Sequence, residues 1–345
     1  MQAVNVLVIT APGQGAQAPG FLSPWLEVPG VATRLGSWSE LAGVDLVRFG
    51  TTAGADEIKD TAVAQPLLVA AALAVAPALF GDTAPFGDTA LPDEDLPAAG
   101  PGLAAAGHSV GELAAGVIAG VLSAADALRL VSVRGRAMAE AAAAQPTGMT
   151  AVLGGDEATV LASIEAHGLT PANVNGAGQI VAAGTMEQLA AFAANPPAGA
   201  RLRPLSVAGA FHTVHMAPAV ADLSMAASAI TVSDPRIVLL SNRDGAIVSY
   251  GPDWLSRIVA QVAAPVRWDA CMRTMASHGV TALIELPPAG TLTGLARRGL
   301  PGVTVAAMKT PDDLDVARKL VAERAGDTLA AEDTPGSEQT QRRHP

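Results

Sequence analysis

The stretch that most constrains this chain is residues 107–111, which read Gly-His-Ser-Val-Gly. The G-x-S-x-G pattern is typical of a tight turn from a strand to a helix, with the serine hydroxyl exposed at the turn. The apolar run 102–106 predicts a buried parallel strand before the turn, and apolar side chains recur at helical spacing between Val110 and Ile118. Ser109 would then lie at a helix N-terminus, where backbone N–H groups favour developing negative charge. The sequence therefore predicts a nucleophilic serine on an α/β fold.

Composition narrows the class of protein. Half of the 345 residues are apolar, which is enough to bury one large core or a core and a smaller domain. The net charge of −11, with no basic tract to offset it, argues against a nucleic-acid partner. The single cysteine, Cys271, rules out an internal disulfide framework and suits a reducing cytoplasm. No secretory signal is evident, and the apolar stretch 63–80 contains Gln65 and two prolines, so we expect a core helix and no membrane insertion.

The N-terminal strand and its loop admit two interpretations. Residues 4–9 predict a buried strand that runs into a glycine-rich loop, 11–17. The loop partly fits the dinucleotide-binding fingerprint G-x-G-x-x-A, which requires a helix to open at its third position. The Pro19-Gly20 pair opposes a helix there. We therefore favour a loop that donates backbone N–H groups into a site at the end of the strand.

A helix predicted over 124–144 carries an arginine on its apolar side. Arg134 lies three residues after Val131 and four before Met138, both of which belong to the apolar stripe. The side chain could extend to the surface along its aliphatic stem. It could equally be held inside, where a guanidinium can clamp a carboxylate with two parallel hydrogen bonds. Periodicity alone leaves both interpretations open.

From Met149 the order of predicted elements changes to strand, helix, strand, strand, helix, strand, ending near Val207. This β-α-β-β-α-β order predicts a compact ferredoxin-like subdomain inserted into the larger domain. His212 follows the last of these strands, at the junction with the large domain. It is three residues from His215, but no third ligand accompanies the pair, so we expect no metal site.

The expected domain organisation has four parts. Residues 1–146 form the first part of the large domain, with helical pieces around 38–46. Residues 147–208 form the small subdomain, and residues 209–324 form the second part of the large domain. From Ala325 the chain becomes polar and charged, which predicts a disordered tail over 325–345. The tandem near-copies in residues 80–101 predict a duplicated surface loop.

Several separated motifs occur in a fixed order along the chain. They are PGQGAQ (12–17), TAVAQP (61–66), GHSVGE (107–112), VRG (133–135), NVN (173–175), GAFH (209–212), PVRW (265–268) and PAGTLTG (288–294). Together they resemble the malonyl-CoA:acyl carrier protein transacylases of bacterial fatty-acid synthesis, a family of acyltransferases, over about residues 4–320. The resemblance implies an α/β-hydrolase-like large domain with an inserted ferredoxin-like subdomain.

The resemblance also implies roles for individual residues. The expected catalytic residues are Ser109 as nucleophile, His212 as its general base and Gln261 as the residue that orients His212. The expected oxyanion hole is made by the backbone N–H groups of Gln14 and Val110. The expected substrate contacts are Arg134 to the malonyl carboxylate, Phe211 against a methyl branch, and Asn175 near the site.

The implied reaction moves malonyl from malonyl-CoA to Ser109 and then to the phosphopantetheine thiol of acyl carrier protein, with ping-pong kinetics. Malonyl-CoA is a substrate, and no metal or redox cofactor is expected. A monomer is expected. Docking of an acidic carrier protein would require local basic groups, for which the candidates are Arg201, Arg203, Arg297 and Arg298.

Three alternatives compete with this interpretation. A serine esterase or thioesterase of the α/β-hydrolase type would place its histidine near the end of the chain, whereas more than a hundred residues follow His212. A catalytically silent scaffold for carrier proteins would have no need of Ser109 or His212. A transacylase of a polyketide pathway would carry the same motifs, so the pathway is left open.

Overall fold

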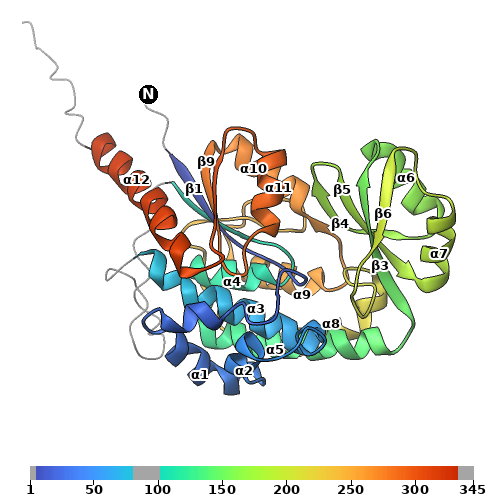
Figure 1. The fold of residues 1–345 in the computed structure, drawn as a ribbon, viewed down its shortest axis with the longest axis horizontal. Coiled ribbons are helices and arrows are strands. Elements are labelled where there is room, and N and C mark those ends of the chain that lie inside the picture. The colour runs from blue at the N-terminus through green and yellow to red at the C-terminus, as the bar shows by residue number, and fades with distance from the viewer. Residues whose placement is uncertain (1–4, 81–101, 333–345) are drawn as a thin grey trace, which may run out of the picture.

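The structure is a computed structural model that describes residues 5–80 and 102–332, in an α/β arrangement with two sheets. Figure 1 shows the two sheets in separate lobes. The duplicated segment predicted at 80–101 lies, apart from Phe80, outside the described residues.

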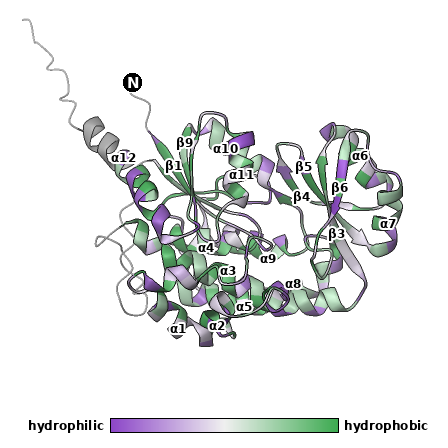
Figure 2. Ribbon diagram, in the orientation of Figure 1, coloured by the Kyte–Doolittle hydropathy of each residue, from purple (hydrophilic) through white to green (hydrophobic). Residues whose placement is uncertain are grey.

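The large sheet has five parallel strands in the order β10-β9-β1-β2-β7. Their bounds are β1 (Val6–Ala11), β2 (Leu103–Gly107), β7 (Val238–Leu239), β9 (Val280–Glu285) and β10 (Thr304–Ala307). Strands β1 and β2 correspond to the apolar runs 4–9 and 102–106, from which they were predicted, because a parallel strand covered on both faces needs apolar side chains on both. Figure 2 shows β1 and β9 coloured as hydrophobic along most of their length.

The two faces of this sheet belong to different cores. Leu7 and Ile9 pack into the larger core, whereas Val8 packs into the other. The larger core is shared with α1 (Val31–Ala42), α2 (Leu46–Thr51), α3 (Thr61–Val75), α4 (Gly111–Ile118), α5 (Ala124–Ala143), α8 (Ala217–Ala227), α9 (Gly251–Gln261) and the start of α12 (Leu314–Glu332). The other core is shared with α10 (Trp268–Ser277) and α11 (Thr291–Gly299). Helices therefore cover both faces, and the carboxyl edge of the sheet is left for a site (Figure 1).

Helix α3 is the predicted core helix. Within the described residues, Thr61–Leu79 is the one segment long and apolar enough to span a membrane, and 83% of its window is buried inside the protein. Its N-terminus is capped by Asp60, whose side chain accepts from the backbone N–H of Ala62. Burial by α4, α5 and α1 accounts for its apolar composition.

The second sheet has the order β6-β3-β5-β4-β8. The predicted order of elements is observed, as β3 (Thr147–Gly154), α6 (Glu157–Ala166), β4 (Thr170–Gly176), β5 (Gln179–Thr185), α7 (Met186–Ala194) and β6 (Ala200–Pro204). The two-residue turn between β4 and β5 has Ala177 and Gly178 at positive φ, as a type I′ hairpin turn requires. The added strand β8 (Val266–Arg267) pairs parallel to β4 and ties this sheet to the rest of the chain.

The faces of this sheet also differ. Val152, Ile180 and Phe192 pack with α6 and α7 in a core of their own. Met149, Val181 and the other residues whose side chains point to the opposite face of the sheet pack instead into the larger core. The second face of the small sheet is thus turned towards the large lobe, where the two lobes meet.

The helical pieces expected around 38–46 are α1, which ends at Ala42, and α2, which begins at Leu46; Gly43 adopts a left-handed φ of 68° and stops α1. One predicted boundary was wrong. The tail expected to be disordered from Ala325 continues as helix α12 to Glu332. The physical reason is propensity, because 325–332 includes three alanines, a leucine and a glutamate, which prolong a helix already started at Leu314.

Candidate active site

The predicted serine turn is present between β2 and α4. Ser109 has a φ of 53°, a left-handed conformation that is strained for a residue with a side chain. The turn is closed by backbone hydrogen bonds from Gly111 to His108 and from Glu112 to Ser109. Such a turn holds the serine hydroxyl away from the backbone at the end of the strand.

The turn requires glycine at 107. A Cβ built on Gly107 would overlap the backbone of Gly111 and Glu112, so neither neighbour could move aside without opening the turn. We expect Gly107→Ala to lower the free energy of unfolding by about 3 kcal/mol or more. Gly36→Ala is the control, because a Cβ on exposed Gly36 of α1 meets nothing within 4 Å; there we expect a gain of about 0.5–1 kcal/mol. Thermal or denaturant unfolding measures both, and equal stability of the two variants would contradict this account of the turn.

Asn242 holds the turn from outside. The backbone N–H of Ser109 donates to Oδ1 of Asn242 (2.7 Å), and Nδ2 of Asn242 donates to the carbonyl of Gly107 (2.7 Å). The side-chain amide of Asn242 therefore forms hydrogen bonds with the Ser109 N–H and the Gly107 carbonyl, in place of backbone partners. The role of this fully buried residue was not predicted from the sequence. Its signal was a polar pair, Ser241-Asn242, directly after a buried strand.

His212 is in hydrogen-bonding contact with Ser109. Its Nε2 lies 2.7 Å from the Ser109 hydroxyl, and its Nδ1 lies 2.8 Å from the backbone carbonyl of Gln261. A carbonyl oxygen can only accept, so Nδ1 carries the proton and Nε2 is left to accept from the serine. This is the arrangement of a nucleophile and its base.

Gln261 orients His212 through its backbone and not through its side chain. The Gln261 side chain has other partners: Oε1 accepts from the Arg134 guanidinium (3.0 Å), and Nε2 donates to the carboxylate of Glu112. Any residue at position 261 would supply a backbone carbonyl to His212. The glutamine side chain is needed for a different purpose, its hydrogen bonds to Arg134 and Glu112.

Arg134 is buried, which decides between the two interpretations of its position on α5. Its side chain is 1% exposed and points to the serine: Nη2 donates to Ser109 Oγ (3.4 Å) and Nη1 to Gln65 Oε1 (2.6 Å). Burial lowers the pKa of Arg134 to about 10, and the charge of Glu112 opposes that shift. The guanidinium stays charged at neutral pH beside the nucleophile.

The environment keeps His212 neutral. Burial, followed by the positive charge of Arg134, lowers the pKa of His212 to about 3. Burial also lowers the pKa of His108, whose Nε2 lies 2.9 Å from Oδ1 of Asn175. The imidazole of His212 is therefore in its basic form throughout the neutral pH range.

This shift predicts an unusual pH dependence. A reaction that uses His212 as its base should not slow between pH 7 and pH 5.5, where a histidine of ordinary pKa would lose about tenfold in its basic form. The folded-state pKa is depressed, so this group contributes stability above pH 6.5 that is lost as the pH falls towards 3. Single-turnover acylation rates, with an unfolding curve at each pH, measure both effects. A tenfold fall in rate at pH 5.5 in a folded protein would refute the depressed pKa.

Glu112 is the second residue that the sequence analysis left without a role. Its side chain is 1% exposed, and its two oxygens accept from the backbone N–H of Asn242 (2.9 Å) and from Nε2 of Gln261. Burial raises the pKa of Glu112 to about 8, and the Asn242 N–H and the charge of Arg134 oppose the rise. Because both oxygens accept from N–H donors, the hydrogen bonds favour the ionised carboxylate. One carboxylate thus connects α4, the segment after β7 and the end of α9.

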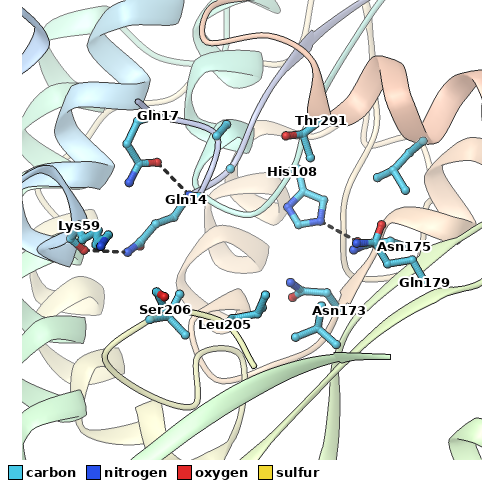
Figure 3. A pocket seen from close by; sticks show the side chains of 16 residues that line it. Gln14, Gln17, Lys59, His108, Asn173, Asn175, Gln179, Leu205, Ser206 and Thr291 are labelled. Carbon is cyan, nitrogen blue, oxygen red and sulfur yellow. Dashed lines mark hydrogen bonds between the residues drawn. The ribbon is translucent and has the colours of Figure 1, made fainter. Parts of the chain in front are cut away.

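A cleft of about 410 Å³ lies between the lobes and reaches His108, the neighbour of Ser109. Figure 3 shows Gln14 and Lys59 on one wall and Asn173 and Asn175 on another. Asn173 Oδ1 is buried and accepts no hydrogen bond from the described residues. An acceptor left open in this way suits a ligand with N–H donors.

The remaining predicted residues lie around the same point. The Gln14 side chain donates to Thr61 Oγ1 (3.2 Å), which fixes the loop after β1. Within the described residues, the backbone N–H groups of Gln14 and Val110 donate to no protein acceptor. Phe211 is buried beside His212. No group of three metal-ligating side chains is found in residues 5–80 and 102–332.

Known proteins are similar to this chain in sequence. The family described as acyl transferase domain matches residues 88–321. A malonyl CoA-acyl carrier protein transacylase of Mycobacterium bovis is 51% identical over 310 residues, which cover 90% of this chain and 98% of that relative. A relative of the same name from Mycolicibacterium smegmatis is 50% identical, over 85% of this chain and 98% of its own.

Solved structures agree. The crystal structure of MCAT from Mycobacterium tuberculosis has a TM-score of 0.82 at 49% identity, covering 91% of this chain and 100% of that one. A malonyl-transacylase in complex with a type II polyketide synthase acyl-carrier protein has a TM-score of 0.80 at 28% identity, covering 91% of this chain and 99% of that one. The chain therefore belongs to the acyl transferase family and, within it, to the malonyl CoA-acyl carrier protein transacylases.

Proposed function

We propose that this protein transfers malonyl from malonyl-CoA to the phosphopantetheine thiol of an acyl carrier protein, through a malonyl ester on Ser109. The observation that carries the proposal is the contact of one serine hydroxyl with both a neutral imidazole and a buried guanidinium, at 2.7 and 3.4 Å. The first contact serves acyl transfer, and the second selects an acyl group with a carboxylate. The names of the relatives at 50–51% identity support the same reaction.

In the acylation step, the Ser109 oxygen attacks the thioester carbonyl while its proton moves to Nε2 of His212. The Gln261 carbonyl accepts from Nδ1–H and stabilises the imidazolium that forms. The N–H groups of Gln14 and Val110 are proposed to bind the oxyanion, each contributing about 3 kcal/mol in the transition state. His212 then returns the proton to the departing coenzyme A thiolate.

The second half repeats these steps in reverse. The thiol of the carrier protein replaces coenzyme A, His212 removes its proton, and attack on the ester releases Ser109. Coenzyme A and the carrier protein present the same phosphopantetheine arm, so one cleft can serve both. We propose that the arm lies in the cleft between the lobes, where Asn173 Oδ1 can accept from one of its amide N–H groups.

Arg134 is proposed to bind the malonyl carboxylate. Its hydrogen-bond partners among the described residues are the neutral oxygens of Gln65, Gln261 and Ser109, so its charge has no direct counter-ion. Phe211, beside the base, is proposed to disfavour a methyl branch next to the thioester carbonyl.

The domain organisation is also a proposal. The turn between β2 and α4 supports an α/β-hydrolase-like large domain made of residues 1–146 and 209–324. The order β6-β3-β5-β4 supports a ferredoxin-like subdomain over 147–208. The extender units so formed would feed fatty-acid synthesis in the cytoplasm, and exposed Arg201 and Arg203, on the strand coloured purple in Figure 2, are proposed to contact the carrier protein.

Intact-protein mass spectrometry after mixing with malonyl-CoA tests the function. A malonyl-sized adduct that disappears on addition of carrier protein bearing a free phosphopantetheine thiol, with malonyl recovered on that thiol, is expected. Steady release of free malonate without transfer would overturn the proposal in favour of a thioesterase.

A further inference from the structure

The pairing of Arg134 with neutral oxygens depends on which way the Gln261 amide points. An amide has one oxygen and one NH₂ group, and a guanidinium can only donate. Arg134 Nη2 lies 3.0 Å from Oε1 of Gln261, so the NH₂ group must point the other way, to Glu112. Reversing the amide would set NH₂ against Arg134 and leave a buried donor without an acceptor.

Glu112 holds the amide in this orientation, and Oδ1 of Asn242, 3.4 Å from Nε2 of Gln261, is a second and longer acceptor for the same NH₂ group. The second oxygen of Glu112 accepts from the backbone N–H of Asn242, a donor that cannot reverse. A carboxylate accepts at both oxygens, so it alone satisfies two donors that approach from opposite ends. The hydrogen bonds therefore converge on Glu112: Arg134 donates to Gln261, Gln261 donates to one oxygen of Glu112, and the Asn242 N–H donates to the other.

The interposed amide also keeps the carboxylate of Glu112 away from Arg134. Glu112 acts on the charge of Arg134 through space, and within the described residues no carboxylate is in hydrogen-bonding contact with the guanidinium. A carboxylate in direct contact would occupy the donors that a substrate carboxylate needs.

We propose that Glu112 is a positioning residue for acyl selectivity: by fixing the Gln261 amide it gives Arg134 neutral partners and leaves its charge for the substrate's carboxylate. The inference rests on the proposed function of Arg134. In this proposal Glu112, the residue directly after the G-x-S-x-G turn, contributes to the preference for malonyl-CoA as well as to the structure of the turn.

Three variants test it: Glu112→Gln, Gln261→Glu and the double exchange Glu112→Gln/Gln261→Glu. In Glu112→Gln, an NH₂ group must face another donor, either at Asn242 or at Gln261. We expect acylation of Ser109 by malonyl-CoA to fall roughly tenfold or more, with acylation by acetyl-CoA changed less, so the preference for malonyl narrows. Gln261→Glu alone sets a carboxylate against both Glu112 and Arg134, and we expect it to narrow the preference in the same direction. Glu140→Gln, an exposed change on α5, is the matched control and should leave both rates unchanged.

The double exchange separates selectivity from structure. The amide introduced at position 112 can donate to the carboxylate introduced at position 261, which restores complementary hydrogen bonds but sets a carboxylate directly on Arg134. We expect the double variant to recover the unfolding temperature that Glu112→Gln loses, while its KM for malonyl-CoA stays at least about tenfold above that of the wild type. Recovery of malonyl selectivity together with stability would overturn the proposal, as would equal losses with both thioesters in Glu112→Gln. Failure of the wild type itself to form a malonyl adduct would instead refute the proposed function.

Discussion

The Ser109→Ala variant should form no malonyl adduct and should lose transferase activity by a factor on the order of 10⁶. The hydroxyl of Ser109 is the group that the structure places 2.7 Å from Nε2 of His212, and alanine offers no atom to carry the acyl group. The remaining groups can still bind substrate, so the loss should appear in kcat far more than in KM. Single-turnover labelling followed by intact mass measurement gives the result directly.

Ser206→Ala is the matched control for this experiment. Ser206 lines the same cleft and is exposed, so an adventitious reaction with the thioester could occur there. We expect Ser206→Ala to label as the wild type does. A malonyl adduct that forms on Ser109→Ala as fast as on the wild type, and still passes to the carrier protein, would show that Ser109 is not the nucleophile. The unfolding temperature of Ser109→Ala should stay close to that of the wild type, since the substitution keeps the backbone N–H that donates to Asn242.

The parts of the fold that follow from local chemistry were predictable. The turn at Ser109 needs glycine at 107 and at 111, and the five-residue pattern 107–111 contains both. The β4–β5 hairpin follows in the same way from Gly176 and Gly178. Periodicity found the helix that carries Arg134 but could not say whether a long side chain on its apolar stripe turns inward, because both outcomes use the same spacing.

The missed contacts join distant parts of the chain. Asn242 reaches the turn across 133 residues, and Glu112 reaches Gln261 across 149. No local pattern encodes such pairs, which form only when the strands and helices come together. Gln261 was expected to orient His212, and the structure shows that its backbone carbonyl makes the contact, an atom that every residue has and that the sequence therefore could not single out.

These contacts support the proposed role of Arg134 in selectivity. Arg134 donates to Gln65 and to Gln261, and Gln261 and the Asn242 backbone N–H both donate to Glu112, so the donors of Arg134 have fixed directions. Its charge also contributes to lowering the pKa of His212, which keeps the base neutral. Under the proposed function, the choice of acyl group and the pKa of the base are thus coupled through one side chain.

The Arg134→Met variant should reverse the preference between thioesters. Methionine keeps much of the volume but cannot pair with a carboxylate, so burying malonyl would leave its charge without a partner, at a cost of about 3–5 kcal/mol. We expect kcat/KM for malonyl-CoA to fall by a factor on the order of 10²–10³, while acetyl-CoA, which has no carboxylate, is accepted as well as before or better. The ratio of the two kcat/KM values is the quantity to measure.

Two controls make this outcome decisive. Arg136→Met changes an exposed arginine on the same helix, which bonds to Ser132 and not to the site, and should leave the ratio unchanged. Arg134→Lys keeps the charge but loses the planar pair of donors, so it should retain a malonyl preference at reduced kcat/KM. Equal losses for both thioesters in Arg134→Met, in a protein that stays folded, would mean that Arg134 supports the nucleophile and not the substrate. A ratio that falls in Arg134→Met and partly recovers in Arg134→Lys can come only from pairing with the substrate's charge, because acetyl and malonyl thioesters react at the same serine with the same base.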